Sequence, residues 1–584
     1  MRLLLIYYWI SGVLLSSGLC LKTAFGQYQS APHIVVFMVD DLGWNDVSFH
    51  GSSQIPTPNI DALAYNGIIL NRHYVLPSCT PTRAAFFSGK YPIRMGMQGE
   101  GIMGGEPRGL PLNVRILPEY LRDLGYSPKL VGKWHLGFHT RQHTPLHRGF
   151  ETFFGFYNSH IAYYDYRYSQ GNMSGFDLHR GDLPAYDVQG QYATDLFTEE
   201  AVKIIDHHDP INSLYLQINH LAAHAPLEPP NDNFNLDDFV HIREPNRRNY
   251  ALMVARMDES LGRIVASLGD KNMLKNSIII FMTDNGAPTI GKYRNSGSNW
   301  PLRGTKYTLY EGGVRGVAAI WSPRLHSMAR VSNNLMHVTD WLPTLYTAAG
   351  GNIADLGEID GVDHWPYLSQ GKEIPRETLL LNIDEISKTE GAIHRRFKLV
   401  RGAYKRGYYD QYYGESGRNH EVPAYNYTLV HRSFVATAIS AHLGDPMTQP
   451  SAMTHLREQA SVLCRRKSTF SYCNETECLF DIVNDPCEAT NIAKQYPKVV
   501  TELDLFLEKY GNVLVKQPRL PIDWLADPRR RNNTWESWLN TGMDLQHLYG
   551  YNAASSVNTV TVCAHLGLAL LIIGLRYLYF NPGY

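Results

Sequence analysis

Four short strand-like segments, each with polar side chains just beyond its carboxyl end, constrain the fold of this chain most strongly. They are rich in β-branched and aromatic residues and show no alternation of polar and apolar positions, which is typical of parallel strands buried on both faces. Open α/β sheets bind ligands beyond the carboxyl ends of such strands, so the polar residues there are expected to share one crevice. The segments are residues 33–39, 126–131, 213–219 and 276–283.

Segments with helical periodicity lie between these runs. Apolar residues recur at helical spacing from Tyr250 to Leu268, and residues 58–65 begin with a proline and stop at Gly67. This alternation predicts an α/β domain over residues 27–375, with a large mixed, mostly parallel sheet flanked by helices. A chain of 584 residues is longer than one compact core usually needs, so two domains are expected. After residue 375 the long apolar runs give way to short strand-like runs and the cysteine cluster. This change predicts a smaller α+β domain with an antiparallel sheet over residues 376–550.

Both ends of the chain resemble targeting segments. Arg2 precedes an apolar run, and the small residues Ala24 and Gly26 are typical of a cleavage site, so residues 1–26 are expected to be a signal peptide. A membrane anchor is the alternative, although the run is short for a span. The apolar tail over residues 551–584 fits a glycolipid-anchor signal, a marginal membrane span or a packed terminal helix. A membrane-related role, with attachment through this tail, is slightly favoured.

Export directed by the expected signal peptide would place the cysteines in an oxidising compartment. Two disulfides are then expected in the C-terminal cluster rather than a zinc site, and the three possible pairings stay open. The cluster consists of Cys464, Cys473, Cys478 and Cys487, whereas Cys79 stands alone in the main body of the chain. Asn-x-Ser/Thr sequences, which agree with a secreted glycoprotein, begin at Asn172, Asn426, Asn474 and Asn532. A formal net charge of −1 excludes a typical nucleic-acid binder.

Two of the strand ends carry oxygen ligands. Asp40 and Asp41 follow the first apolar run, and Asp284 and Asn285 follow the run at 276–283. Such residues often cap helices, which is the alternative interpretation. Several carboxylates in one crevice need a compensating cation, however, and oxygen donors suit calcium or magnesium. The sequence therefore predicts a site for a hard metal ion.

The lone Cys79 stands at a predicted helix start. Pro81 is well placed to open a helix and Gly89 to end it, so Cys79 is expected at the helix N-terminus, where negative charge is favoured. A buried unpaired cysteine is the alternative.

The segment CTPTR at Cys79, followed by GKYPIRMGMQ, resembles the signature of the type I sulfatases, within the alkaline-phosphatase-like superfamily. Five further segments between residues 33 and 363 match the family in the same order along the chain. Their sequences are similar to those of the arylsulfatase B, I and J group. Thr82 departs from the serine usual at that signature position, which bears on the efficiency of the cysteine oxidation. The five segments are VDDLGWND (Asp40, Asp41), GKWHLG (Lys133, His135), HAPLEPP (His224), TDNG (Asp284, Asn285) and LRGTKYTLYEGGVRG (Lys306).

The resemblance implies a catalytic cycle. A formylglycine-generating enzyme would oxidise Cys79 to an aldehyde, whose hydrate attacks sulfur beside one calcium ion. Asp284 would help to activate the attacking hydroxyl and Arg83 would steady it. The other roles implied are sulfate binding by Lys133 and Lys306, protonation of the leaving alcohol by His224, and proton removal by His135; the metal ligands implied are Asp40, Asp41, the Cys79 derivative, Asp284 and Asn285. His220, beside His224, is interpreted as structural.

The substrates implied are sulfated glycans or small aryl sulfates, most plausibly N-acetylgalactosamine 4-sulfate in glycosaminoglycans. The destination implied is the lysosome, with the cell surface or medium as the alternative. Two rival functions are a phosphate-ester hydrolase of the same superfamily and a secreted or membrane-held binding protein with an inactive site. The phosphatase would use Ser or Thr with two metals, whereas this chain has Cys79 and ligands for one.

Overall fold

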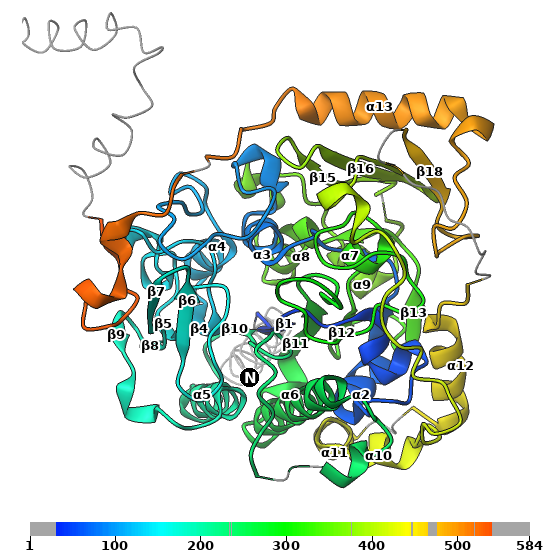
Figure 1. Cartoon of the computed structure of the whole chain (residues 1–584). Coiled ribbons are helices and arrows are strands. Elements are labelled where there is room, and N and C mark those ends of the chain that lie inside the picture. The colour runs from blue at the N-terminus through cyan, green and yellow to red at the C-terminus, as the bar shows by residue number, and fades with distance from the viewer. Residues whose placement is uncertain are drawn as a thin grey trace, which may run out of the picture. The chain divides into compact units, whose positions relative to one another are not determined.

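A ten-stranded sheet runs through the middle of the molecule (Figure 1). Its strands, in spatial order, are β13 (Arg330–Ser332), β2 (Ile68–Leu70), β12 (Ala318–Trp321), β11 (Ser277–Thr283), β1 (His33–Val39), β10 (Leu214–Asn219), β4 (Ser127–Lys133), β5 (Thr152–Phe156), β8 (His179–Arg180) and β9 (Leu183–Pro184). The five strands from β11 to β5 are parallel, whereas β12, β8 and β9 pair antiparallel to their neighbours. The predicted mixed, mostly parallel sheet is confirmed.

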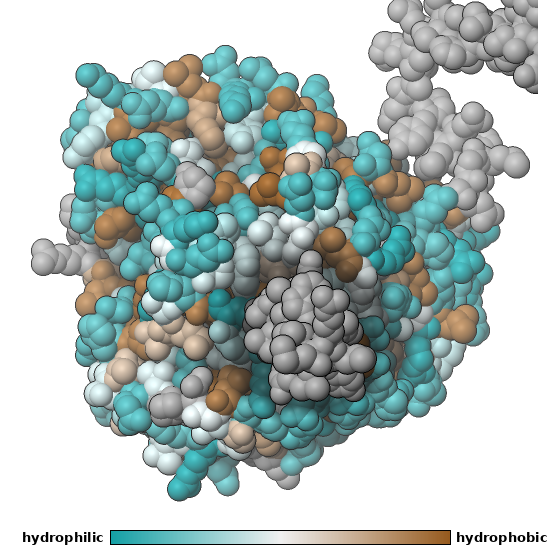
Figure 2. Space-filling view, turned by 180° about the vertical axis from the view of Figure 1, so that it is seen from behind, coloured by the Kyte–Doolittle hydropathy of each residue, from teal (hydrophilic) through white to brown (hydrophobic). Residues whose placement is uncertain are grey.

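The computed structural model describes residues 31–539, apart from 233, 235, 375, 445–447, 465–472, 474–475 and 519. The predicted signal peptide, the apolar tail at 551–584 and Asn474 lie outside the described residues. Within the described part of the chain, every helix is too short or too polar to cross a membrane. On the face seen in Figure 2, hydrophobic residues are interspersed among hydrophilic ones.

The central strands are continuous apolar runs because helices cover both faces of the sheet. Every residue of β1, β10 and β11 is buried. In Figure 1 one layer of helices lies below the sheet and another above it. The lower layer contains α2 (Pro58–Asn66), α5 (Ala193–His207) and α6 (Pro245–Asp270), and the upper layer contains α3 (Cys79–Ser88), α4 (Leu117–Asp123) and α8 (Trp341–Ala348).

A four-stranded antiparallel sheet follows in the C-terminal part, as predicted. Its order is β15 (Thr378–Asp384), β16 (Thr389–His394), β17 (Phe397–Arg401) and β18 (Cys478–Asp481). Val500, Leu503 and Leu507 of α13 (Pro497–Gly511) pack into one of its hydrophobic clusters. The other elements are α7 (Glu311–Val314), α9 (Trp365–Gln370), α10 (Tyr427–His431), α11 (Phe434–Leu443), α12 (Pro450–Ala460), β3 (His73–Tyr74), β14 (Met336–His337), β6 (Arg167–Gln170) and β7 (Met173–Phe176).

Two disulfides stabilise the segment around β18. They join Cys464 to Cys487 and Cys473 to Cys478, which confirms the predicted disulfides and selects one of the three pairings. Cys79 is a free, buried cysteine.

A buried ion network joins the small sheet to α7. Lys398 of β17 is fully buried, and its Nζ lies 2.9 Å from Glu311 Oε1 and 2.8 Å from Glu488 Oε1. Glu311 begins α7, five residues after Lys306, and its backbone N–H donates to Glu488 Oε2 over 2.7 Å. Tyr74 Oη also donates to Glu311 Oε2, over 3.1 Å. The C-terminal sheet therefore fixes the segment that follows Lys306.

Candidate active site

The predicted oxygen ligands meet at the carboxyl edge of the central strands. β1 and β11 are parallel neighbours with Val39 opposite Thr283, so the residues that follow each strand emerge side by side. Asp40, Asp41, Asp284 and Asn285 are all fully buried there.

Hydrogen bonds fix this cluster. Asp41 has a left-handed backbone (φ 62°), and its N–H donates to Asp284 Oδ1 over 3.2 Å. Asp41 Oδ1 accepts from Asn285 Nδ2 at 2.6 Å and from Lys306 Nζ at 2.5 Å. Asp40 Oδ2 accepts from Lys133 Nζ at 2.5 Å. The two lysines predicted to bind sulfate therefore converge on the two aspartates.

Three oxygens of the cluster, although buried, have no hydrogen-bond partner among the described atoms: Asp40 Oδ1, Asp41 Oδ2 and Asn285 Oδ1. His224 Nε2 lies 3.4 Å from Asp41 Oδ2, and burial lowers the pKa of His224 well below its usual range. Burial, with the added repulsion of Asp284, raises the pKa of Asp41, and burial with the repulsion of Asp40 raises that of Asp284. Unpaired buried acceptors and destabilised carboxylates are what a bound cation would compensate, so the residues present fit a hard metal ion.

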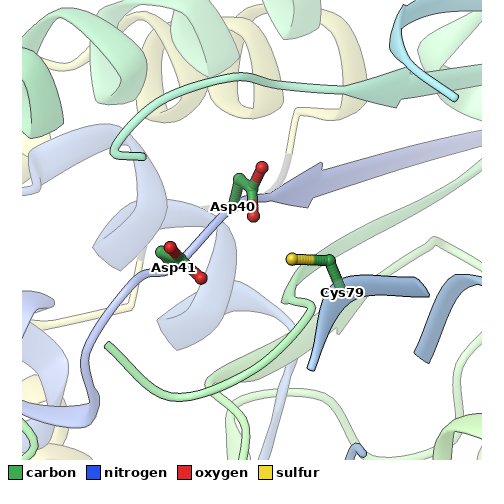
Figure 3. Close-up of side chains that lie close together, drawn as sticks. All are labelled: Asp40, Asp41 and Cys79. Atoms are coloured by element: carbon green, nitrogen blue, oxygen red, sulfur yellow. The ribbon is translucent and has the colours of Figure 1, made fainter. Parts of the chain in front are cut away.

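Cys79 faces these carboxylates from the start of α3 (Figure 3). The ligand atoms of Asp40, Asp41 and Cys79 all lie within 4.8 Å of one another. Helix α3 begins at Cys79 itself, two residues before Pro81, and ends as predicted at Gly89, whose φ is 65°. Burial raises the pKa of the Cys79 thiol to about 11. An unmodified thiol is therefore protonated at neutral pH and is a poor nucleophile.

The remaining predicted residues surround Cys79. Lys306 Nζ lies 3.2 Å from Cys79 Sγ, and Arg83 Nη2 donates to Asp284 Oδ2 over 2.8 Å. Burial alone would lower the pKa of Lys306, but the nearby acidic groups, with Asp41 contributing most, outweigh burial and raise it. Lys306 therefore stays charged beside Cys79.

Two histidines complete the crevice. His135 Nε2 lies 3.0 Å from the carbonyl oxygen of Ile102, and His135 Nδ1 has no partner among the described atoms. His224 Nδ1 lies 2.5 Å from the carbonyl oxygen of Ala225, which leaves Nε2 facing Asp41. Because a carbonyl accepts only from an N–H, each ring has one nitrogen fixed as a donor and the other left for proton transfer.

His160 and Tyr293 also border the site and were missed by sequence reasoning. The His160 ring stacks on His224 with centroids 4.9 Å apart and an interplanar angle of 17°, and Tyr293 lies 5.7 Å from His224. His160 comes four residues after β5. The sequence feature that could have pointed to it is the aromatic run TFFGF, which forms that strand.

His220 lies outside this group. Its Nε2 lies 3.1 Å from Ser260 Oγ and its ring packs on Phe37, in line with the structural role predicted for it.

The predicted glycosylation sites that the structure describes are all on the surface. Asn172, Asn426 and Asn532 are exposed. Asn172 lies in the turn between β6 and β7, and Asn426 precedes α10.

Comparison with known proteins agrees with this arrangement. The family model described as Sulfatase matches residues 32–351. Arylsulfatase J of Mus musculus is 35% identical over 87% of this chain and 80% of its own length. N-acetylgalactosamine-6-sulfatase of Sus scrofa is 33% identical over 58% of this chain and 66% of its own length, and human arylsulfatase A is 30% identical over 65% and 75%.

Solved structures share the fold. Ps i-CgsB superimposes with a TM-score of 0.65 at 23% identity, over 90% of this chain and 98% of that one. PsFucS1 sulfatase from Pseudoalteromonas sp. gives a TM-score of 0.61 at 22% identity, over 86% and 94%. With the family match over more than half of the chain, these findings show that the protein belongs to the sulfatase family and is a sulfuric ester hydrolase.

Proposed function

We propose that this protein removes sulfate from sulfated sugars, with N-acetylgalactosamine 4-sulfate in glycosaminoglycans as substrate, using a formylglycine made from Cys79 and one calcium ion. The observation that carries the proposal is the position of Cys79, whose sulfur faces unpaired buried carboxylate oxygens and the ammonium group of Lys306. Relatives named N-acetylgalactosamine-6-sulfatase support the choice of sugar. The 4-position follows the resemblance to the arylsulfatase B group.

Asp40, Asp41, Asp284 and Asn285 would hold the calcium ion, because they offer the only kind of donor, oxygen, that this ion prefers. When bound, the ion supplies positive charge that lowers the pKa of a nearby hydroxyl and attracts sulfate oxygens. The three carboxylates of the described cluster balance the charges of its two lysines and one arginine, so its net charge is zero. A divalent cation and a sulfate group, whose charges offset each other, could therefore bind there together.

The chain's own residues then perform the proton transfers and the positioning. The formylglycine hydrate at position 79 would supply the attacking hydroxyl, with Asp284 as its hydrogen-bond acceptor. Lys133 and Lys306 would bind the sulfate oxygens as negative charge develops on them. His224 Nε2 would protonate the leaving alcohol, and the unpartnered Nδ1 of His135 would take a proton from the second hydroxyl.

The first test is the mass of the tryptic peptide over residues 73–83, from protein secreted by eukaryotic cells. We expect the mass change of thiol-to-aldehyde conversion at Cys79, together with hydrolysis of a small aryl sulfate. An unmodified Cys79 in active protein would refute the proposed nucleophile.

Calcium is expected to stabilise the fold as well as to support activity. Chelation should abolish aryl sulfate hydrolysis and lower the melting temperature, because a ligand that binds only the folded state stabilises it by mass action. At a calcium concentration a hundred times Kd the gain is about 2.7 kcal/mol. The measurement is a thermal melt against calcium concentration, with Asp40→Asn as the control that should lose the calcium response. A calcium-independent melt would contradict the metal assignment.

The secretory pathway is the proposed location, with the lysosome or the cell exterior as destination. The two disulfides support it, because disulfides persist in oxidising compartments. The exposed positions of Asn172, Asn426 and Asn532 also support it, since glycans need surface asparagines. The formylglycine-generating enzyme would be the partner during maturation.

A further inference from the structure

Two loops from distant parts of the chain border the catalytic crevice. Tyr293 belongs to the first loop, residues 288–296, and lies 5.7 Å from the ring of His224. The second loop, residues 404–409, packs on Tyr307, which directly follows Lys306. Tyr404 stacks on the Tyr307 ring at 5.2 Å and an interplanar angle of 21°. The loops also meet, because a Cβ on Gly291 would lie 2.4 Å from Tyr409 Oη.

Both loops present cations to solvent beside the crevice. Lys292 and Arg294 on the first loop, and Lys405 and Arg406 on the second, are all exposed. The charge of Lys292 reaches the crevice, since it is among the groups that lower the pKa of His160, although burial of His160 is the largest cause. We call these four residues the rim.

None of the rim side chains forms an ion pair with a carboxylate of the described chain. Lys292 and Lys405 instead lie over the rings of Tyr293, at 4.8 Å, and Tyr404, at 5.2 Å. Glu100, which borders the second loop, accepts a hydrogen bond from the Tyr404 hydroxyl rather than from a rim cation. The rim charges therefore stay available to a ligand.

The backbone of the second loop is strained where it presents its cations. Lys405 and Arg406 are consecutive left-handed residues, with φ of 45° and 59°. This conformation is unfavourable for side chains other than glycine, and strain of this kind is concentrated at functional sites.

We propose that the rim binds a second negatively charged group, a sulfate or a carboxylate, on the sugar next to the one that carries the reacting sulfate. The enzyme would then prefer extended polyanionic glycans to small aryl sulfates. The proposal rests on the proposed function, since it places that reaction within a longer chain of sugars. Exposed cations attract such a chain in a salt-dependent way, while the buried lysines contact the reacting sulfate itself.

The test separates binding of a glycan from turnover of a small substrate. Binding of a chondroitin 4-sulfate tetrasaccharide is measured by calorimetry at several salt concentrations, on the whole secreted protein carrying Cys79→Ala so that the ligand is not desulfated. Lys292→Gln, Arg294→Gln, Lys405→Gln and Arg406→Gln are combined in one variant. We expect its Kd to rise about tenfold, with a weaker salt dependence, while kcat/KM for a small aryl sulfate, measured with Cys79 intact, stays within about twofold of wild type.

A control variant removes two charges elsewhere. Lys494 and Lys498 are exposed, the first just before α13 and the second in its first turn, and Lys494→Gln with Lys498→Gln should leave the Kd unchanged. A Kd that is unchanged in the rim variant, or that rises equally in the α13 variant, would overturn the proposal. A carboxyl-reduced tetrasaccharide identifies the group: the rim effect disappears if it is a carboxylate and persists if it is a sulfate. Wild-type protein that binds the tetrasaccharide through the rim but hydrolyses no sulfate ester would refute the proposed function alone.

Discussion

Replacing Cys79 with alanine is expected to lower sulfate-ester hydrolysis by about four orders of magnitude or more, as loss of the nucleophile does in other hydrolases. The fold should survive, because alanine removes a single buried sulfur atom, and the cavity left costs about 1 kcal/mol. The measurements are kcat/KM for a small aryl sulfate and a thermal melt of the same preparation.

Cys79→Ser is the sharper control. Serine keeps the size of the side chain and offers a hydroxyl, yet an alcohol has no second hydroxyl with which to expel the bound sulfate. We expect the serine variant to be as inactive as the alanine variant in steady state. Near-normal turnover in either variant would show that position 79 does not supply the nucleophile.

The second large effect is expected at the buried ion network. Lys398→Met removes the cation between Glu311 and Glu488 and leaves two buried carboxylates facing each other. Loss of one partner of a buried pair costs about 3–5 kcal/mol. Chemical denaturation at neutral pH measures this loss. The exposed pair of Lys129 and Glu151, 2.9 Å apart, provides the comparison, and Lys129→Met should cost less than about 1 kcal/mol.

The loss caused by Lys398→Met should depend on pH. In the wild type, burial raises the pKa of Glu488; burial would also raise that of Glu311, but the charges of Lys398 and Arg315 outweigh it and lower that pKa. Without Lys398, at least one carboxyl takes up a proton, so its folded-state pKa exceeds its unfolded value. Stability from such a group is present at low pH and lost as pH rises. The variant should therefore be closer to wild type at pH 5 than at pH 7.5, and an equal deficit at both would contradict this account.

Strands β1 and β11 were predictable because each is buried on both faces and is therefore an almost continuous apolar run. β1 was predicted at the observed residues, and β10 and β11 within one residue. The outer strands gave no such signal: β2 has three residues and β8 has two, and the partners of β2 are far away in sequence. The domain boundary predicted near residue 375 stays a prediction.

The structure brings together the residues predicted from the segments that resemble the family, and their catalytic and metal-binding roles stay predictions. Features that depend on tertiary contacts were not identified. The left-handed backbone of Asp41 is imposed by its bond to Asp284, 243 residues away in sequence. His160 enters the site only because β5 lies beside β4, and the rim forms only because a loop beyond β17 packs on Tyr307.

Cys79 and Lys306 are far apart along the chain, so the ribosome synthesises Cys79 well before Lys306. The two residues touch in the folded protein but are separated by 227 positions. The neighbours of β1 also come late, since β10 and β11 follow residue 213. At about 5–20 residues per second, the ribosome needs roughly 10–45 seconds to travel from Cys79 to Lys306. During that interval the crevice cannot close, so the modifying enzyme proposed above would be able to reach Cys79 before folding buries it.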